Sequence, residues 1–224
     1  MCGRFTLAEP NLISERFNTS NSINNFDPSW NIAPSQMVPT ITRNSPSKIV
    51  MMKWGLLFNK SSKTGVINIR SETTLEKPYF QHLLTNNRCL IVADSFYEWG
   101  DVNLEGKSEK YPFNFFLDKR RLFGFAGIYN DIKDAEDKIH FSCSILTTKP
   151  NKIVARAHNR MPVIIKEKDE EFWLDPKNTN FEKLFKLLAP FPEKEMKVNV
   201  VSKRVNSPAN DDMQLIDPVK QILQ

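Results

Sequence analysis

Cys2 is the residue of this sequence with the most distinctive potential chemistry. Met1 precedes a small residue and is of the kind commonly removed, which would leave Cys2 with a free α-amine beside its thiol. The α-amine has a reference pKa of about 7.7–8.0, so much of it is nucleophilic at physiological pH. The thiol is a strong nucleophile once ionised. Such a 1,2-aminothiol captures an aldehyde as a five-membered thiazolidine, and a ring-opened abasic sugar is one such aldehyde. A cysteine at this position by chance is the simpler alternative.

Three further segments carry polar groups that suit such a reaction. Asn68 and Arg70 are two residues apart, so they would share one face of a strand, and arginine pairs with phosphate in a planar fork. Glu98 follows an apolar run between two aromatic residues, where partial burial would raise its pKa and suit it to proton transfer. His158 lies in a basic loop and could act as acid or base. Taken singly, each of these side chains could equally be a solvent-exposed polar residue.

Strands must position these groups, and the sequence predicts many of them. Helical spacing is found mainly towards the two ends of the chain and strand-like runs in its middle, so we predict one α+β domain over residues 1–224. Its core would be a curved, mostly antiparallel, barrel-like sheet with flanking helices. The predicted strands are Met37–Thr42, Lys48–Trp54, Val66–Arg70, Arg88–Trp99, Tyr111–Leu117, Arg121–Tyr129, Ile139–Thr147, Met161–Lys166 and Met196–Val201.

Local signals predict several connections. Thr6-Leu7-Ala8-Glu9 is a capping-box sequence and predicts a short helix towards Phe17. The segment 18–34 is rich in Asn, Ser and Pro and predicts irregular structure. The charged segment Gly100–Lys110 predicts a hairpin loop. Asp118-Lys119-Arg120 predicts the turn of a second hairpin, between Tyr111–Leu117 and Arg121–Tyr129.

Composition narrows the function classes. The 224 residues carry a formal net charge of +5, a mild indication of an anionic partner. No apolar stretch reaches the roughly 18 residues of a membrane span, and the N-terminus lacks the apolar run of a signal peptide. We therefore expect a cytoplasmic protein, associated with the nucleoid in a prokaryote or nuclear in a eukaryote. The three cysteines and three histidines are scattered, so we expect no metal, no cofactor and no disulfide framework.

Six motifs occur in the order seen in the SOS-response-associated peptidase (SRAP) family, which the chain resembles from Cys2 to about Pro218. They are Met1-Cys2-Gly3-Arg4-Phe5, Trp30-Asn31-Ile32-Ala33-Pro34, Trp54-Gly55-Leu56, Asn68-Ile69-Arg70-Ser71-Glu72-Thr73, Ala93-Asp94-Ser95-Phe96-Tyr97-Glu98-Trp99 and His158-Asn159-Arg160-Met161-Pro162. The late segment Val201–Asn206 is similar to the family's closing segment. Ile69, where the family often has Ala, and the loop 101–110 depart from the pattern.

The resemblance implies a sensor of abasic sites in single-stranded DNA that forms a thiazolidine crosslink through Cys2 after removing its own Met1. The crosslink would shield the lesion and be reversible. In this interpretation Asn68 orients the amine or stabilises developing charge, Glu98 shuttles protons, and His158 protonates the sugar ring oxygen or promotes its opening. Arg70 matches the family's phosphate-binding arginine. The resemblance also implies contacts of Arg4, Thr147 and Arg160 with the DNA backbone. Trp54 would either stack on a base or belong to the core.

Two other functions compete with this one. The start Met-Cys-Gly is also typical of N-terminal-nucleophile cysteine amidohydrolases, but those proteins continue with glycine-rich loops, and this chain has only 7 glycines. A module that binds single-stranded DNA without covalent chemistry is the second alternative. In each case we expect a monomer with no obligate protein partner.

Overall fold

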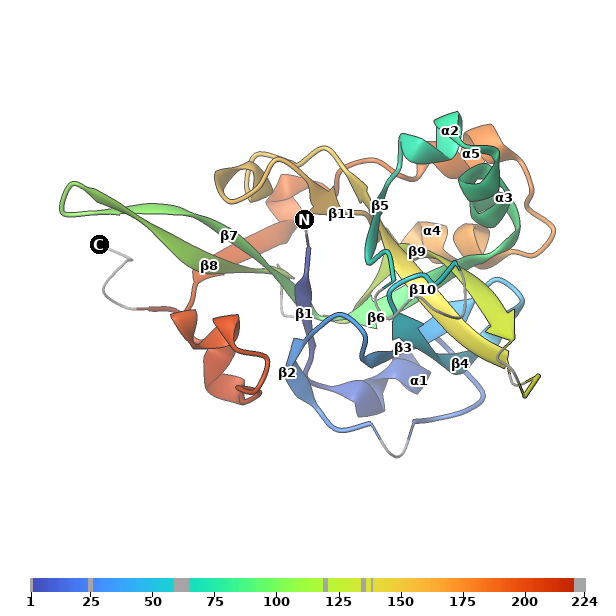
Figure 1. Ribbon diagram of the computed structural model, residues 1–224, viewed down its shortest axis with the longest axis horizontal. Coiled ribbons are helices and arrows are strands. Elements are labelled where there is room, and N and C mark those ends of the chain that lie inside the picture. The colour runs from blue at the N-terminus through green and yellow to red at the C-terminus, as the bar shows by residue number, and fades with distance from the viewer. Residues whose placement is uncertain are drawn as a thin grey trace.

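Two β-sheets form the framework of the computed structural model, which describes residues 2–23, 26–58, 65–118, 121–133, 136–137 and 139–219. The first sheet is antiparallel. Its strands, in spatial order, are β13 (Met196–Val200), β8 (Lys107–Leu117), β7 (Ser95–Leu104), β1 (Arg4–Leu7) and β2 (Ser29–Ile32). β1 is thus held between β7 and β2, which fixes the path of the chain just after Cys2 (Figure 1).

The second sheet closes on itself. β10 (Ile139–Thr148) pairs with β4 (Ser45–Trp54) on one side and with β9 (Phe123–Lys133) on the other, and β3 (Met37–Thr42) and β6 (Arg88–Ala93) complete the ring. The short strands β11 (Met161–Pro162), β12 (Ile164–Ile165) and β5 (Asn68–Arg70) pair with this ring. β5 runs parallel to β10, and all other pairings except β4 with β10 are antiparallel. The predicted barrel-like core is therefore confirmed.

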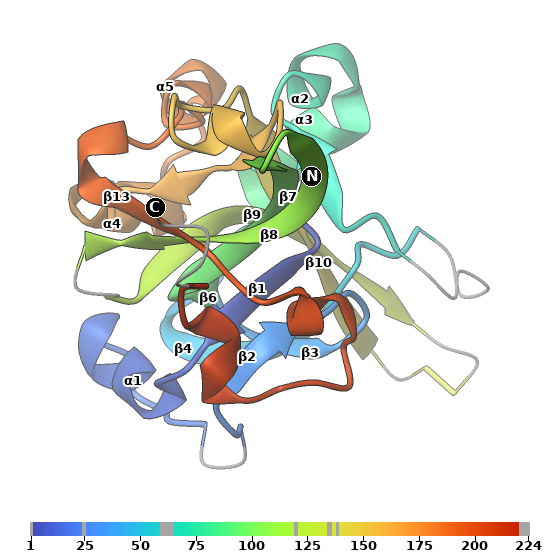
Figure 2. The same ribbon diagram turned by 90° about the vertical axis from the view of Figure 1, so that its left-hand side faces the viewer.

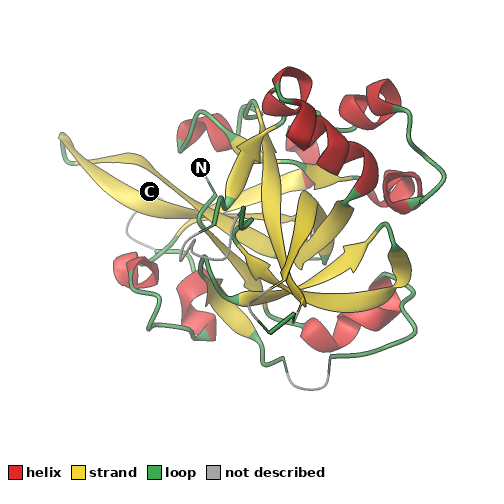
Figure 3. Ribbon diagram, turned by 45° about the vertical axis from the view of Figure 1, so that its right-hand side comes forward, coloured by secondary structure: helices red, strands yellow, loops and turns green. Residues whose placement is uncertain are grey.

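Short helices flank the strands (Figure 3). They are α1 (Ile13–Arg16), α2 (Thr73–Glu76), α3 (Pro78–Asn86), α4 (Glu167–Leu174) and α5 (Phe181–Lys186). α2, α3 and α5 lie together at one end of the molecule, whereas α1 lies at the opposite end (Figures 1 and 2). The α+β fold class predicted from the sequence is confirmed. Within the described part of the chain, no helix is both long and apolar enough to span a membrane.

The N-terminal capping box is a wrong prediction. Thr6 lies in β1, and its hydroxyl contacts Asp94 and Ser95 instead of capping a helix. A 3-10 turn begins at Pro10 and α1 begins at Ile13. The register of β1 with β7 buries Thr6, so tertiary pairing overrides the local signal. The segment 18–34, predicted to be irregular, contains strand β2.

The two predicted hairpins differ from the structure in opposite ways. β7 and β8 continue through the expected loop and turn only at Glu105 and Gly106, both with positive φ. They form a long ribbon that extends beyond the rest of the molecule (Figure 1). The second hairpin is wrong, because β8 pairs with β7 and β13, whereas β9 belongs to the barrel. Residues 119–120 of its predicted turn lie outside the described residues.

Candidate functional site

Cys2 lies two residues before the start of β1 and is fully buried. The Asn68 amide Nδ2 donates to the Cys2 carbonyl at 2.7 Å, and the Cys2 thiol donates to the Arg4 carbonyl at 3.6 Å. Asn68 lies on β5, which pairs with β10 at Ile145, so the barrel edge holds the amide against the N-terminal residue. The other amide atom, Asn68 Oδ1, is buried and has no hydrogen-bond partner among the described residues. An acceptor is therefore available beside the Cys2 backbone.

Glu98 reaches the same place from β7. Arg4 pairs with Tyr97 across β1 and β7, so one further step of this register brings Glu98 level with Gly3. The Glu98 side chain is 2% exposed. Burial raises its pKa from 4.5 to about 7, against the opposing effects of the N-terminal ammonium and Lys110. A carboxyl group with a pKa near neutrality can both accept and donate a proton at physiological pH.

The raised pKa of Glu98 predicts a stability cost above neutral pH. Below about pH 4.5 the folded and unfolded chains both carry a protonated Glu98, and above about pH 7 burial of the charge opposes folding in full. We expect Glu98→Gln to stabilise the protein at pH 8 by about 2–3 kcal/mol, and the gain to disappear towards pH 4.5. Urea unfolding at the two pH values measures it. Glu171→Gln makes the same substitution at an exposed position of α4 and is the matched control.

The Cys2 thiol is kept protonated. Burial raises its pKa well above the ordinary value, and the charge of Glu98 raises this pKa further. A buried neutral thiol is a weak nucleophile, since the thiolate is the reactive form. The thiol therefore needs a proton acceptor before it reacts.

His158 lies on the segment that follows a 3-10 turn, Val154–Arg156. Its Nδ1 accepts from the Arg160 backbone N–H at 3.0 Å, so a neutral ring carries its proton on Nε2. Burial, followed by the N-terminal ammonium, lowers the His158 pKa, which favours the neutral ring at physiological pH. Gly100 allows this loop to approach β7, because a Cβ there would lie 2.6 Å from the Ala157 Cα.

Arg70 and Arg160, both predicted DNA contacts, differ in their surroundings. Arg70 is exposed at the end of β5. Arg160 is held in a two-pronged ion pair by Glu72, at 2.8 and 2.7 Å, and its pairing lowers the Glu72 pKa to about 2. Glu72 is not among the predicted site residues, and no local signal pairs it with Arg160, which lies 88 residues away in the chain. Arg160 therefore has an internal partner, which favours a role in fixing the His158 loop.

The structure contradicts the predicted DNA contact of Thr147 and the predicted base stacking of Trp54. Thr147 is fully buried, its carbonyl accepts from Arg160 and Ser71, and its hydroxyl contacts the Ile69 carbonyl, so it faces no DNA backbone. Trp54 is also fully buried. Its ring lies 4.9 Å from that of Phe5 and its Nε1 donates to the Ile67 carbonyl at 3.0 Å. No ring face remains for a base, so Trp54 is a core residue, the alternative considered from sequence.

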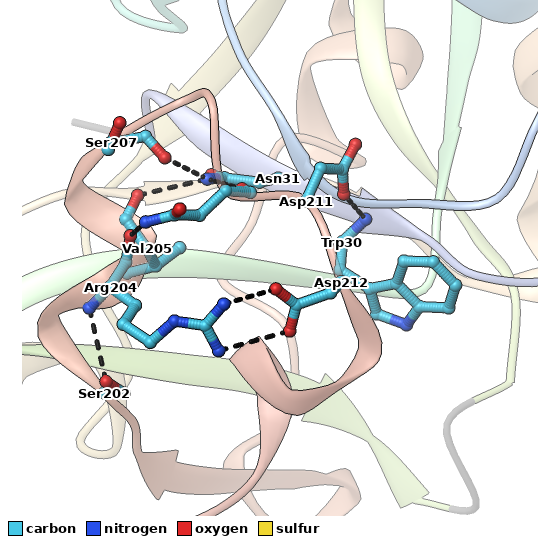
Figure 4. A network of polar contacts seen from close by, with 9 residues as sticks. Trp30, Asn31, Ser202, Arg204, Val205, Ser207, Asp211 and Asp212 are labelled. Atoms are coloured by element: carbon cyan, nitrogen blue, oxygen red, sulfur yellow. Dashed lines mark hydrogen bonds and ion pairs between the residues drawn. The ribbon is translucent and has the colours of Figure 1, made fainter.

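Arg4 belongs to a polar network with the C-terminal segment. Its guanidinium donates to Asn31 Oδ1 at 2.7 Å and to the carbonyls of Val205 and Asn206 at 2.9 and 3.3 Å. These internal partners favour a role in fixing the start of β1 over the predicted DNA contact. Asn31, which is not among the predicted site residues, donates through its Nδ2 to the carbonyls of Val205 and Ser207 (Figure 4). The same Nδ2 also donates to the Asn210 carbonyl.

Ion pairs and caps secure the same segment. Arg204 pairs with Asp212, and the Ser202 hydroxyl accepts from the Arg204 N–H (Figure 4). Asp211 accepts from the Trp30 N–H and the Ser29 hydroxyl on β2. The segment thus packs against β2. It also contacts Arg4, the first residue of β1, which lies two positions after Cys2.

A cavity of about 620 Å³ lies elsewhere, between α1, the start of β4 and α4. Its lining includes Arg16, Glu167 and Glu170, and none of the candidate site residues. Arg16 and Glu170 form a two-pronged ion pair, each bond 2.9 Å, at its wall. Among the described residues, no group of three or more His, Cys, Asp or Glu side chains is arranged to hold a metal ion.

Comparison with known proteins agrees with the sequence motifs. Abasic site processing protein YoqW of Bacillus subtilis is 42% identical over 97% of this chain and 99% of its own length. Abasic site processing protein HMCES of Rattus norvegicus is 24% identical over 89% of this chain and 67% of its own length. A crystal structure of a protein from Bacteroides thetaiotaomicron has the same fold, with a TM-score of 0.82 at 23% identity, over 97% of this chain and all of that one.

The family assignment rests on most of the chain. Residues 1–208 match the family described as SOS response associated peptidase. This range includes Cys2, Asn68, Glu98 and His158, which the fold brings to the start of β1. The chain therefore belongs to the SOS response associated peptidase (SRAP) family.

Proposed function

We propose that this protein processes abasic sites, as the names of its relatives state for those proteins, and that its substrate is single-stranded DNA. We further propose that it captures the lesion covalently through Cys2 after removal of Met1. The observation that carries this proposal is the position of Cys2, whose backbone is held by Asn68 beside a carboxyl group, Glu98, with a pKa of about 7. This set of groups matches what aldehyde capture needs.

The covalent step begins at the amine. The Cys2 α-amine adds to the aldehyde carbon of the ring-opened sugar, and loss of one water leaves a Schiff base. The Cys2 sulfur then adds to the same carbon, its proton passes to a base, and the amine nitrogen keeps one hydrogen in the closed thiazolidine. The net change is loss of one water. The raised pKa of the thiol supports this order, since the thiol is protonated until a base takes its proton.

The neighbouring side chains have distinct tasks in this proposal. Glu98 takes the thiol proton and returns protons to the departing water, which its near-neutral pKa allows. His158 donates to the sugar ring oxygen through Nε2 and promotes ring opening, consistent with its Nδ1 accepting from Arg160. Asn68 orients the amine through the amide that already holds the Cys2 carbonyl. The reverse steps would release the lesion, so the crosslink is reversible.

Removal of Met1 uses the same groups. The peptide bond before Cys2 must be hydrolysed to free the amine, and Cys2 with Glu98 supplies a nucleophile and a proton carrier next to that bond. We propose that this self-processing is autocatalytic. The amidohydrolase alternative shares the nucleophile and differs in its substrate, so a glutaminase assay separates the two.

Arg70 is the proposed phosphate ligand, because it is exposed at the end of the strand that carries Asn68. We expect Arg70→Ala to weaken binding to single-stranded DNA for all sequences and to reduce the salt slope by about 1. Binding titrations at several salt concentrations measure the slope. Lys168→Ala removes an exposed charge on α4 and serves as the control. An unchanged slope for Arg70→Ala would assign this arginine a purely structural role.

Intact mass spectrometry tests the proposed function. We expect untagged protein to lack Met1 and, after incubation with a single-stranded oligonucleotide carrying one abasic site, to gain the oligonucleotide mass less one water. The adduct should survive denaturation. Loss of Met1 without any adduct would contradict aldehyde capture and favour the amidohydrolase. Binding without an adduct, with Met1 retained, would favour the non-covalent module.

A further inference from the structure

Two exposed aromatic rings, Phe58 and Tyr79, lie in contact on the surface. We call this pair the aromatic platform. Phe58 is 47% and Tyr79 46% exposed, and their ring centroids are 5.8 Å apart at 54°. The partly buried Phe80 contacts both rings edge-on, with centroids at 6.1 Å from Phe58 and 5.4 Å from Tyr79. A contiguous group of exposed apolar side chains on a protein surface commonly marks a site where a partner binds.

Buried polar groups hold this platform in place. Asn130 on β9 is 9% exposed, and its Nδ2 donates to the Leu57 carbonyl at 2.5 Å and to the Tyr79 hydroxyl at 3.2 Å. The fully buried Ser142 donates to Asn130 Oδ1 at 2.7 Å and accepts from the Leu57 N–H at 3.0 Å. These bonds fix the residue before Phe58 and the end of the Tyr79 ring. The two rings are therefore held in place while they remain exposed, as a pre-organised binding surface requires.

Strand β10 gives the position of the platform relative to the site. Leu57 contacts β10 at Ser142, Asn68 pairs with it at Ile145, and Arg70 pairs with it at Thr147. With about 3.3 Å per strand residue, the platform's anchor lies about 10 Å from Asn68 along β10, on the side opposite Arg70. The aromatic platform, Asn68 beside Cys2 and the exposed Arg70 thus lie in this order alongside β10.

We propose that the aromatic platform stacks a nucleobase that flanks the lesion. This inference rests on the proposed function and adds to it a subsite for the neighbouring nucleotide. Phe58 and Tyr79 offer flat apolar faces, and every base has a face that can stack on them without sequence readout. Sequence tolerance suits a protein that recognises a missing base. Continuity with Asn68 and Arg70 along β10 favours the DNA strand over a protein partner as the occupant.

The test removes the rings and the bases separately. One oligonucleotide carries a stable tetrahydrofuran analogue of the abasic site between normal nucleotides, and a second carries further tetrahydrofuran units at the flanking positions. We expect the Phe58→Ala/Tyr79→Ala variant to bind the first about 5- to 100-fold more weakly than the wild type, and to bind the second as the wild type does. Base-free units on one side and then on the other identify the flank that stacks.

Two controls keep the result interpretable. Leu75→Ala removes an equally exposed apolar side chain, 55% exposed on the neighbouring α2, and should leave binding unchanged. Tyr79→Phe keeps the ring and loses the bond from Asn130, so it should retain most of the binding. An equal loss on both oligonucleotides, or no loss on either, would overturn the subsite. Crosslinking of a true abasic site at saturating protein is scored separately, so failure of covalent capture is distinguishable from failure of stacking.

Discussion

Cys2→Ala is expected to bind single-stranded DNA that contains an abasic site and to form no adduct that survives denaturation. The variant keeps a terminal amine when Met1 is absent, so a Schiff base can still form, but no sulfur is present to close the thiazolidine. Borohydride reduction should trap that Schiff base and restore a covalent product. Denaturing gels with and without borohydride, and intact masses, measure both products.

Cys143→Ala is the matched control for this result. Cys143 is as fully buried as Cys2 but lies on β10 within the barrel, so its removal should leave the crosslink intact. The mass of each variant reports whether Met1 is present, which matters because Cys2 is also the proposed nucleophile for its removal. A denaturation-stable adduct of Cys2→Ala at the wild-type level would rule out the thiazolidine.

Arg88→Met is expected to destabilise the fold by about 3–5 kcal/mol. Arg88 is fully buried, and its guanidinium donates to five backbone carbonyls at 2.6–3.2 Å. Two of these carbonyls are in α3, Leu84 and Thr85, and three are at or after the end of α4, Trp173, Asp175 and Asn178. Methionine fills similar volume and donates nothing, so the carbonyls lose their partner.

Chemical denaturation with an unchanged m-value measures this loss. Arg121→Met serves as the control, since Arg121 is 46% exposed and makes a surface ion pair with Glu195 at 3.4 Å, which predicts a change below about 1 kcal/mol. Arg88 also titrates unusually, because burial lowers its pKa to about 10. A change for Arg88→Met no larger than that for Arg121→Met would mean that water replaces the guanidinium at these carbonyls.

The fold class and the family followed from the sequence because they depend on features that a linear chain displays. Strand-like runs in the middle of the chain indicated an α+β fold, and six ordered motifs indicated the family. The chemical potential of Cys2, Glu98 and His158 also follows from residue type and immediate neighbours. The prediction that burial raises the Glu98 pKa agrees with its 2% exposure and a pKa of about 7.

Connectivity could not be predicted from local signals. The capping box at Thr6 is overridden by pairing of β1 with β7, and β8 and β9 belong to different sheets instead of forming a hairpin. Strand pairing depends on contacts between residues far apart in the chain, which a local pattern does not contain. The need for glycine at position 100 could not be predicted for the same reason. It arises only because the His158 loop packs against β7 and leaves no room for a Cβ.

The division between binding and structural residues was likewise decided by the tertiary structure. Trp54, Thr147 and Arg160 have side chains that can contact DNA, and composition alone cannot separate an exposed tryptophan from one packed on Phe5. Burial places Trp54 in the core, and pairing with Glu72 favours a structural role for Arg160. The sequence by itself determined which chemistry is possible, because chemistry belongs to the side chain. The fold determined which side chains are brought together and which are covered, because contact and exposure exist only in three dimensions.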